Sequence, residues 1–333
     1  MMRIILSKSS CPARWFRQSL FIAAWLLVAS MPSSSIAYDI LIGTGEAGSF
    51  SHFTGRVISR IIHKQFDDLQ CTVVPAASQV HNLTNLQGGS LDICLVDSRT
   101  LHDAVASKGS FQFLDITYDS LRDVVAVYDI PISFVVHSNA KIDLLDDLKG
   151  KRINAGVPGS HQHFVVKTVM KIKNWSDEDF SLIEELPPSH SQDTMAFCHG
   201  AIQAMVHIGV HPDPALQQLF RLCQARLLNI GQADIETLLK AHPAFIKTEI
   251  AADTYPSLPV SITTFGTKMK LVASDSLDEE TVYNLLAALY RGRKYLKSAH
   301  PALGALAEPS WEKPDAGIEL HPGAVKYFNK QEL

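Results

Sequence analysis

Short apolar runs alternate with segments of helical periodicity from about residue 38 onward. Runs of apolar and β-branched residues predict strands, and apolar positions three or four residues apart predict helices. The pattern predicts strands at 39–42, 71–74 and 91–96, with helices at 50–64 and 80–86 between them. Strands and helices in strict alternation indicate a parallel sheet with helices on its faces, which is an α/β fold.

The alternation then starts again. Two more strands are predicted at 122–127 and 133–136, and we place a crossing between two lobes at the 128–131 junction that joins them. A strand at 152–155 leads through Pro158, Gly159 and Ser160 into a helix at 164–173, which repeats the first strand-turn-helix unit in outline.

The rest of the chain returns to the first lobe. A strand is predicted at 204–208, and the crossing back is placed at 255–259. A capping box from Ser276 to Glu279 predicts the start of a helix whose apolar positions pack on the first lobe. We therefore expect one lobe from 38–130 with 262–333 and another from 131–261, closing on a ligand like a clamp.

The N-terminal region, 1–37, has its basic, apolar and small-residue segments in the order typical of a secretory signal peptide. Its four basic residues and no acidic residue precede an apolar run at 20–28, and small residues follow up to Ala37. We expect cleavage after Ala37, a mature N-terminus at Tyr38 and export to the periplasm. A permanent anchor is the alternative, although the run is shorter than the roughly 20 residues that span a bilayer.

Charge and cysteine content narrow the class of protein. The chain has a formal charge of −4, and removal of the four N-terminal cations leaves 26 basic and 34 acidic residues, which disfavours nucleic acid or anionic lipid as a partner. Cys71 and Cys94 fall in strand-like runs, where buried free thiols are expected. The spacing of Cys71, Cys94, Cys198 and Cys223 does not match a disulfide framework, so the sequence leaves open whether any two of them form a disulfide.

The glycine-rich turn after the first strand predicts an anion cradle. Gly43, Gly45 and Gly48 would allow positive φ and close approach of the backbone, and the following helix offers unpaired N–H groups. The same letters satisfy the dinucleotide fingerprint GxGxxG, but the second strand ends in Pro75 and alanines instead of the acidic residue that holds a ribose. A turn without any ligand is the other alternative.

Motifs of catalysis and of metal binding are missing from the sequence. It contains no GxSxG, HExxH or cysteine-nucleophile motif, and the Glu184-Glu185 pair precedes a Pro-Pro loop, as a solvated pair would. His161 and His163 have no acidic or cysteine partner at local spacing, so they do not predict a metal site. We expect a binding protein without a cofactor.

Six sequence pieces in order resemble the TAXI branch of the TRAP-transporter solute-binding proteins, over about 40–328. They are GTGEAGSF (43–50), S-x-x-x-N (78–82), DLKGKRINAGVPGS (147–160), GVHPDP (209–214), AADTYP (251–256) and GIELHPGAVKYF (317–328). The resemblance implies a bilobal type II periplasmic binding-protein fold. It also implies capture of a small organic anion, a dicarboxylate or an amino acid such as glutamate, for an ion-coupled membrane permease.

The chain departs from the family pattern at three places. Asp97-Ser98-Arg99 stands where glutamine, serine and aspartate are usual, Gly159-Ser160-His161 where glycine, serine and glycine are usual, and Gln203 where aspartate is usual. These departures imply a shifted ligand preference.

The candidate ligand-binding residues combine the turns with the resemblance. Hydroxyl groups donate to a carboxylate, and an aromatic ring can wall a pocket. The alternatives are helix capping for Ser49 and Ser78, core packing for Phe50, and a solvated loop with a mutual or local ion pair for Asp97 and Arg99. The expected ligand-binding set is Gly43, Thr44, Gly45, Ser49, Phe50, Ser78, Asn82, Asp97, Ser98, Arg99, Gly159, Ser160 and His161.

These observations favour an exported solute receptor. A periplasmic sensor or surface antigen with the same ligand-binding fold is the first alternative, and an enzyme on that fold is the second. A neighbouring permease gene would favour transport, a neighbouring sensor-kinase gene would favour the sensor, and turnover of a bound metabolite would favour the enzyme.

Overall fold

The computed structural model describes residues 38–66, 69–187, 192–307 and 317–331. The predicted signal segment, 1–37, lies outside the described residues. No helix in the described ranges is both long enough and apolar enough to cross a membrane.

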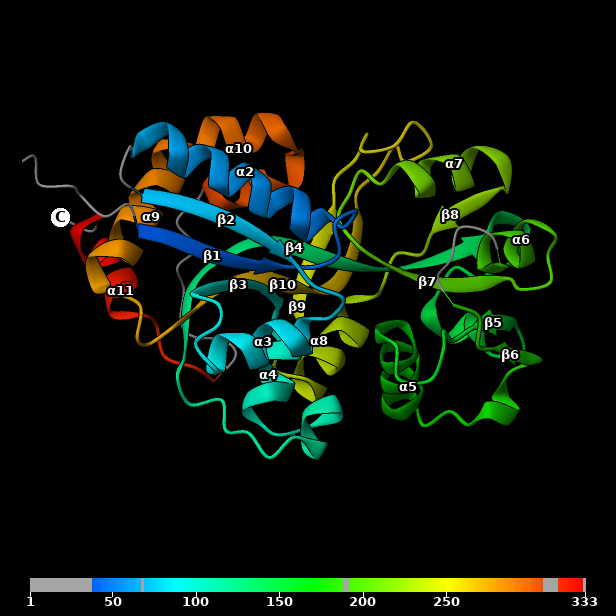
Figure 1. Ribbon diagram of the computed structural model, residues 1–333. Helices are drawn as coiled ribbons and strands as arrows, with labels where there is room; N and C mark the ends of the chain where they lie inside the picture. Colours follow the sequence, from blue (N-terminus) through cyan, green and yellow to red (C-terminus); the bar gives the residue numbers. More distant parts are fainter. Residues whose placement is uncertain (1–37, 67–68, 188–191, 308–316, 332–333) are drawn as a thin grey trace, which may run out of the picture. The chain divides into compact units, whose positions relative to one another are not determined.

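A single mixed sheet organises the described residues, with ten strands in the order β2-β1-β3-β10-β4-β7-β5-β6, β8 beside β4 and β9 beside β10 (Figure 1). Its first part is the predicted β-α-β-α-β unit. The strands are β1 (Tyr38–Thr44), β2 (Leu69–Pro75) and β3 (Ile93–Asp97), and the helices are α2 (Phe50–Gln65) and α3 (Gln79–Gln87). Strands β1 and β3 run parallel, and every residue of β3 is buried, as expected for a strand covered on both faces.

One prediction about the next strands is wrong. The segments at 122–127 and 133–136 belong to one strand, β4 (Leu121–His137), which pairs antiparallel with the long strand β10 (Ile262–Ser274). Pro131 does not interrupt β4, because β7 pairs with it only from Ile132 onward and the missing N–H falls at that junction. On the other side Gly266 lies opposite Pro131, and a Cβ there would clash with the backbone oxygen of Ile130.

The second part of the sheet is again α/β. Strand β5 (Arg152–Asn154) pairs in parallel with β6 (Leu182–Glu184) and β7 (Ala204–Ile208). Helix α5 (His161–Lys173) begins three residues earlier than predicted, because Ser160 caps it. The remaining elements here are α6 (Gln192–Cys198), α7 (Pro214–Leu222), β8 (Ala225–Leu227), α8 (Gln232–Ala241) and β9 (Ile246–Ile250). Helix α4 (Ser98–Val105) directly follows β3 and packs against it and against α3.

The last helices are α9 (Glu279–Arg291), α10 (Arg293–Ala299) and α11 (Pro322–Gln331). They gather around α9, which packs against α2, α10 and α11 (Figure 1). The predicted capping box is wrong in detail: Asp278 caps α9 by accepting from Thr281 N, whereas Ser276 bonds to Ser274.

The buried apolar side chains gather in separate clusters along the sheet. One cluster joins α2, α9 and α11 to the β1 end, and Ile42, Ile58 and Leu285 belong to it. Another joins α5 and α8 to the β5 end, and it includes Val165 and Leu238. The long strands β4 and β10 contribute residues to both clusters, so they connect the two packed regions.

The cysteines separate into two kinds. Cys71 and Cys94 are buried free thiols, which confirms the prediction, and burial raises the pKa of the Cys94 thiol to about 12. Cys198 and Cys223 form a disulfide, which resolves the pairing that the spacing left open. It ties the C-terminal residue of α6 to the residue that follows α7.

We expect loss of this disulfide to lower the free energy of unfolding by about 3.5 kcal/mol, because the bond closes a loop with a sequence separation of 25. Urea unfolding of Cys198→Ser/Cys223→Ser against the wild type measures the difference. Dithiothreitol should reproduce the loss in the wild type and leave the double variant unchanged. An equal midpoint for wild type and variant would contradict the expectation.

Candidate ligand-binding site

The first turn, between β1 and α2, satisfies its own polar groups. Ser49 caps α2 by accepting from His52 N at 3.2 Å, and Gly45 N donates to Ser51 Oγ at 3.0 Å. The hydroxyl groups of Ser49 and Ser51 lie 3.0 Å apart. Ser51 was not predicted, and the signal for it was a second serine within the first turn of the helix.

The positive φ predicted for the glycines of this turn is wrong. Gly43, Gly45 and Gly48 all have negative φ, whereas Gly159 in the second turn has φ of 85°. Space explains two of them: a Cβ on Gly43 would lie 2.6 Å from Leu91 Cδ1, and one on Gly45 would lie 2.7 Å from Ser51 Oγ. A larger residue at either position would have to displace these neighbouring side chains.

Two predicted residues support this turn from inside. Thr44 and Asn82 are fully buried. The Thr44 hydroxyl contacts His52 Nδ1 at 3.0 Å, and Asn82 Nδ2 donates to Thr44 O at 2.8 Å. Their side chains join β1 to α2 and α3.

Phe50 and Ser78 lie in different surroundings. The Phe50 ring packs edge-on to Tyr128 and His300, at 5.0 and 4.6 Å between centroids. Ser78 is exposed and caps α3 by accepting from His81 N at 3.2 Å.

The residues after β3 do not form a solvated loop. Asp97 and Ser98 are buried, and Asp97 caps α4 by accepting from Arg99 N at 2.8 Å. Its other oxygen accepts from Thr267 Oγ1 at 2.5 Å. Ser98 Oγ donates to Ala244 O and accepts from Lys268 N, so these polar side chains join α4 to β10 and to the loop before β9.

The Arg99 guanidinium turns away from Asp97. It pairs with Asp103 at 3.2 Å, one turn further along α4, and lies 4.0 Å above the ring of Phe164 on α5. The local ion pair is therefore present, and the mutual pair with Asp97 is not formed. A cation over an aromatic ring contributes about 0.5–2 kcal/mol, more when water is excluded.

His161, the first residue of α5, belongs to the same contact region. Burial lowers its pKa; the carboxylates of Asp97 and Asp103 act to raise the pKa, and the Arg99 cation acts to lower it. Three of the predicted residues, Asp97, Arg99 and His161, are thus brought together from α4 and α5. Aromatic rings pack beside them. The ring centroid of Phe164 lies 5.2 Å from that of His242 and 6.2 Å from that of Phe245.

Two buried polar atoms in this region have no hydrogen-bond partner among the described residues. They are Arg99 Nε and His161 Nε2. A buried donor without a partner costs about 1–3 kcal/mol, and native structures rarely leave one unpaired. Both atoms can donate to an anion, so the α4–α5 contact region has the polar groups of an anion site.

The second turn presents the N-terminus of α5. Ser160 caps the helix by accepting from His163 N at 3.1 Å, and the left-handed Gly159 precedes it. A Cβ on Gly156 would lie 2.7 Å from Gln162 Cβ, so the turn packs tightly against the helix start.

A cavity of about 310 Å³ runs along β7 to its carboxyl end, next to the first turn of α5. Gln162 of α5, Thr194 of α6, His207 of β7 and Asp213, the cap of α7, all line it. Carboxyl ends of strands are the edge at which open α/β sheets bind ligands. The sequence analysis predicted residues near this cavity at the start of α5, but it predicted none of these four lining residues.

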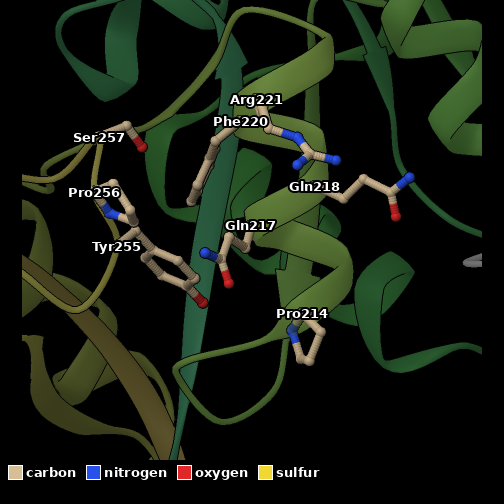
Figure 2. Close-up of a pocket in the computed structure, with 8 residues that line it drawn as sticks. All are labelled: Pro214, Gln217, Gln218, Phe220, Arg221, Tyr255, Pro256 and Ser257. Atoms are coloured by element: carbon tan, nitrogen blue, oxygen red, sulfur yellow. The ribbon is translucent and has the colours of Figure 1, made fainter.

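A larger cavity, about 660 Å³, lies elsewhere and contains none of the predicted site residues. It is a groove along the exposed face of α7, with the loop from Tyr255 to Ser257 beside it (Figure 2). The Gln217 side chain points toward Tyr255, while Gln218 and Arg221 extend side by side in another direction. The α4–α5 region is the candidate ligand site, because a guanidinium, an imidazole and the buried nitrogen atoms Arg99 Nε and His161 Nε2, without partners among the described residues, belong to it.

No group of three or more metal-ligating side chains in the described ranges is arranged to hold a metal ion. The site chemistry is that of helix N-termini, hydroxyl groups, one guanidinium and one imidazole. Such groups bind anions by hydrogen bonding and electrostatic attraction.

Comparison with known proteins identifies the fold and the family. A TctC solute-binding protein from Polaromonas is 15% identical, with 80% of this chain and 86% of that chain covered and a TM-score of 0.54. MatC from Rhodopseudomonas palustris, solved with bound malate, is 13% identical, with 88% and 96% covered and a TM-score of 0.51. These similarities establish the α/β fold of the periplasmic solute-binding proteins. The sequence also matches the NMT1-like family over residues 42–331, and the chain belongs to that family.

Proposed function

We propose that the protein is an exported solute receptor of the TAXI type that binds a small organic anion between two lobes. The observation that carries the proposal is the α4–α5 contact region, where Arg99 Nε and His161 Nε2 are buried without partners beside the N-termini of both helices. A carboxylate can accept hydrogen bonds from both atoms, and such charge-assisted bonds contribute roughly 1.5–3 kcal/mol each.

The lobes of the proposal are 38–130 with 262–333, and 131–261. The separate apolar clusters support this division, because α2 and α9 pack in one and α5 and α8 in another. Continuous strands β4 and β10 would then form the hinge. Arg99 on α4 and Phe164 on α5 would touch across the cleft in the closed form.

A small dicarboxylate or an amino acid such as glutamate is the ligand class we propose. The malate in MatC supports a dicarboxylate by analogy of fold alone. The remaining members of the predicted set would surround the ligand through the turn at Gly43 to Phe50, through Ser78, and through the turn from Gly159 to His161. Asn82, Asp97 and Ser98 would hold these turns in position.

We place the protein in the periplasm, with an ion-coupled permease as partner and no catalytic activity. The export order of residues 1–37 supports this location, and the Cys198–Cys223 disulfide fits an oxidising compartment.

Native mass spectrometry of freshly purified protein tests the proposal directly. We expect a co-purified small anion, released on denaturation, and calorimetric titration with malate and glutamate then ranks the ligand classes. A protein that carries no small molecule and binds no small carboxylate would overturn the proposal.

We expect Ser160→Ala to weaken binding of the identified anion about tenfold or more, because the variant loses one charge-assisted hydrogen bond. The melting temperature without ligand should change little, since a helix cap contributes only about 1 kcal/mol. Asp278→Ala is the matched control, as it removes the cap of α9 outside the proposed site. Equal affinities of Ser160→Ala and Asp278→Ala would contradict the role of Ser160.

A further inference from the structure

We propose a second anion site, for a phosphate-bearing ligand, in a basic pocket between the last turns of α2 and the junction of α9 and α10. The pocket has a volume of about 560 Å³. Four cationic side chains line it: Arg60, Lys64, Arg291 and Lys294. It contains none of the residues of the proposed carboxylate site, so the two proposals stand independently.

The positive charge of this region is a local exception. The chain has 30 basic and 34 acidic residues, yet the segments 50–66 and 281–307, which include α2, the part of α9 after Glu280, and α10, contain no acidic residue. Helices α2 and α9 pack against each other, which gathers these charges on one part of the surface. The basic residues of the two segments are Arg56, Arg60, Lys64, Arg291, Arg293, Lys294 and Lys297.

Among the residues that the structure describes, the four pocket cations have no carboxylate partner, and none of the pocket-lining residues is acidic. Elsewhere on the surface lysines and arginines do pair, as Lys326 does with Glu279 and Glu280. Four like charges around one cavity repel each other, and a bound multivalent anion relieves that repulsion.

Helix dipoles explain only two of the four cations. Lys64 and Arg291 lie in the last turns of α2 and α9, where positive charge is favourable. Arg60 lies further from the end of α2, and Lys294 lies in the first turn of α10, where positive charge is unfavourable. A function in ligand binding accounts for all four.

The pocket is built on packed elements. Gly292 lies against Ile61 so closely that a Cβ would come within 2.7 Å of Ile61 Cγ2. Gln65 Nε2 donates to Ala288 O at 2.8 Å, which joins the end of α2 to α9. Tyr295, 45% exposed, also lines the pocket. Guanidinium groups bind phosphate in a bidentate way and lysines add point charges, so phosphate fits this set of donors.

Calorimetric titration of the mature protein with sodium pyrophosphate at low ionic strength tests the site. We expect saturable binding that weakens as salt is added. The variant Arg60→Glu/Lys294→Glu should lose at least tenfold in affinity. The control Lys171→Glu/Lys240→Glu changes the net charge equally at exposed lysines of α5 and α8, and its affinity should stay within about twofold of the wild type.

Sedimentation with phosphatidylglycerol vesicles distinguishes the source of the phosphate. Vesicle binding that the Arg60→Glu/Lys294→Glu variant loses, without pyrophosphate binding, would assign the site to a lipid headgroup, and pyrophosphate binding alone would assign it to a free phosphate. Circular dichroism confirms that both variants fold. An equal loss in the control variant, or no binding of either probe by the wild type, would overturn the proposal.

Discussion

Replacing Lys270 with methionine should lower the free energy of unfolding by about 3–5 kcal/mol, because it leaves a carboxylate buried without its cation. Lys270 Nζ lies 2.5 Å from Asp123 Oδ2, and the two side chains are only 4% and 5% exposed. The pair joins the central strands β10 and β4. Asp123 also binds the segment before α11 through its backbone, since its N–H donates to Glu319 O and its carbonyl accepts from His321 N.

The double variant Lys270→Met/Asp123→Leu should recover most of this loss, because a buried ion pair replaced by apolar groups is often neutral in stability. Lys326→Met is the exposed control, because its pairs with Glu279 and Glu280 are solvated and exposed ion pairs contribute little to stability. Urea unfolding of the variants gives the free energies. A loss in Lys270→Met no greater than in Lys326→Met would show that the buried pair does not stabilise the sheet.

The parts of the fold that depend on local pattern were predictable from the sequence. The elements from β1 to β3 follow from alternating apolar runs and helical spacing, and β7 was predicted with its observed bounds. The break predicted in β4 failed because Pro131 was interpreted locally. Its tolerance depends on which strand lies beside it, and that neighbour, β7, is formed by residues more than 70 positions later.

Of the candidate site, only the residues that begin its helices were predictable from the sequence. The caps Ser49, Ser78 and Ser160 follow from local chemistry, and the structure places each at the start of its helix. The partners of the charged residues could not be predicted, since Thr267 meets Asp97 from 170 positions away. Phe164, whose contact with Arg99 defines the α4–α5 region, carries no signal in the sequence beyond an apolar position.

The same limit applies to Gly43. A glycine in a turn favours the prediction of positive φ, because that is its commonest use. Here the glycine makes room for the side chain of Leu91, which follows α3 along the chain. Tight packing between distant residues leaves no local trace, so the residue was predicted correctly as a special position and for the wrong reason.

Stability should fall as the pH drops from 6.5 toward 3, and His211 should be a main cause. Burial lowers the pKa of His211 from 6.5 to about 3; neighbouring His207 lowers it further, and Asp213 acts in the opposite direction. Its Nδ1 lies 2.7 Å from Tyr255 Oη and its Nε2 3.2 Å from Ser133 Oγ. In this pH window the unfolded chain binds a proton at residue 211 that the folded protein does not bind.

The free energy of unfolding therefore decreases by about 1.4 kcal/mol per pH unit below 6.5 through this one group, and by roughly 4–5 kcal/mol over the whole window. Above pH 6.5 both states hold a neutral imidazole, and the contribution of His211 to the pH dependence vanishes. His211→Asn, which cannot titrate, should show a slope shallower by about 1.4 kcal/mol per unit between pH 6 and 4.5. Its slope between pH 7.5 and 8.5 should equal that of the wild type, which serves as the internal control for the lost hydrogen bonds. Urea unfolding at a series of pH values measures both slopes, and parallel curves below pH 6 would show that His211 is protonated as readily in the folded protein as in the unfolded chain.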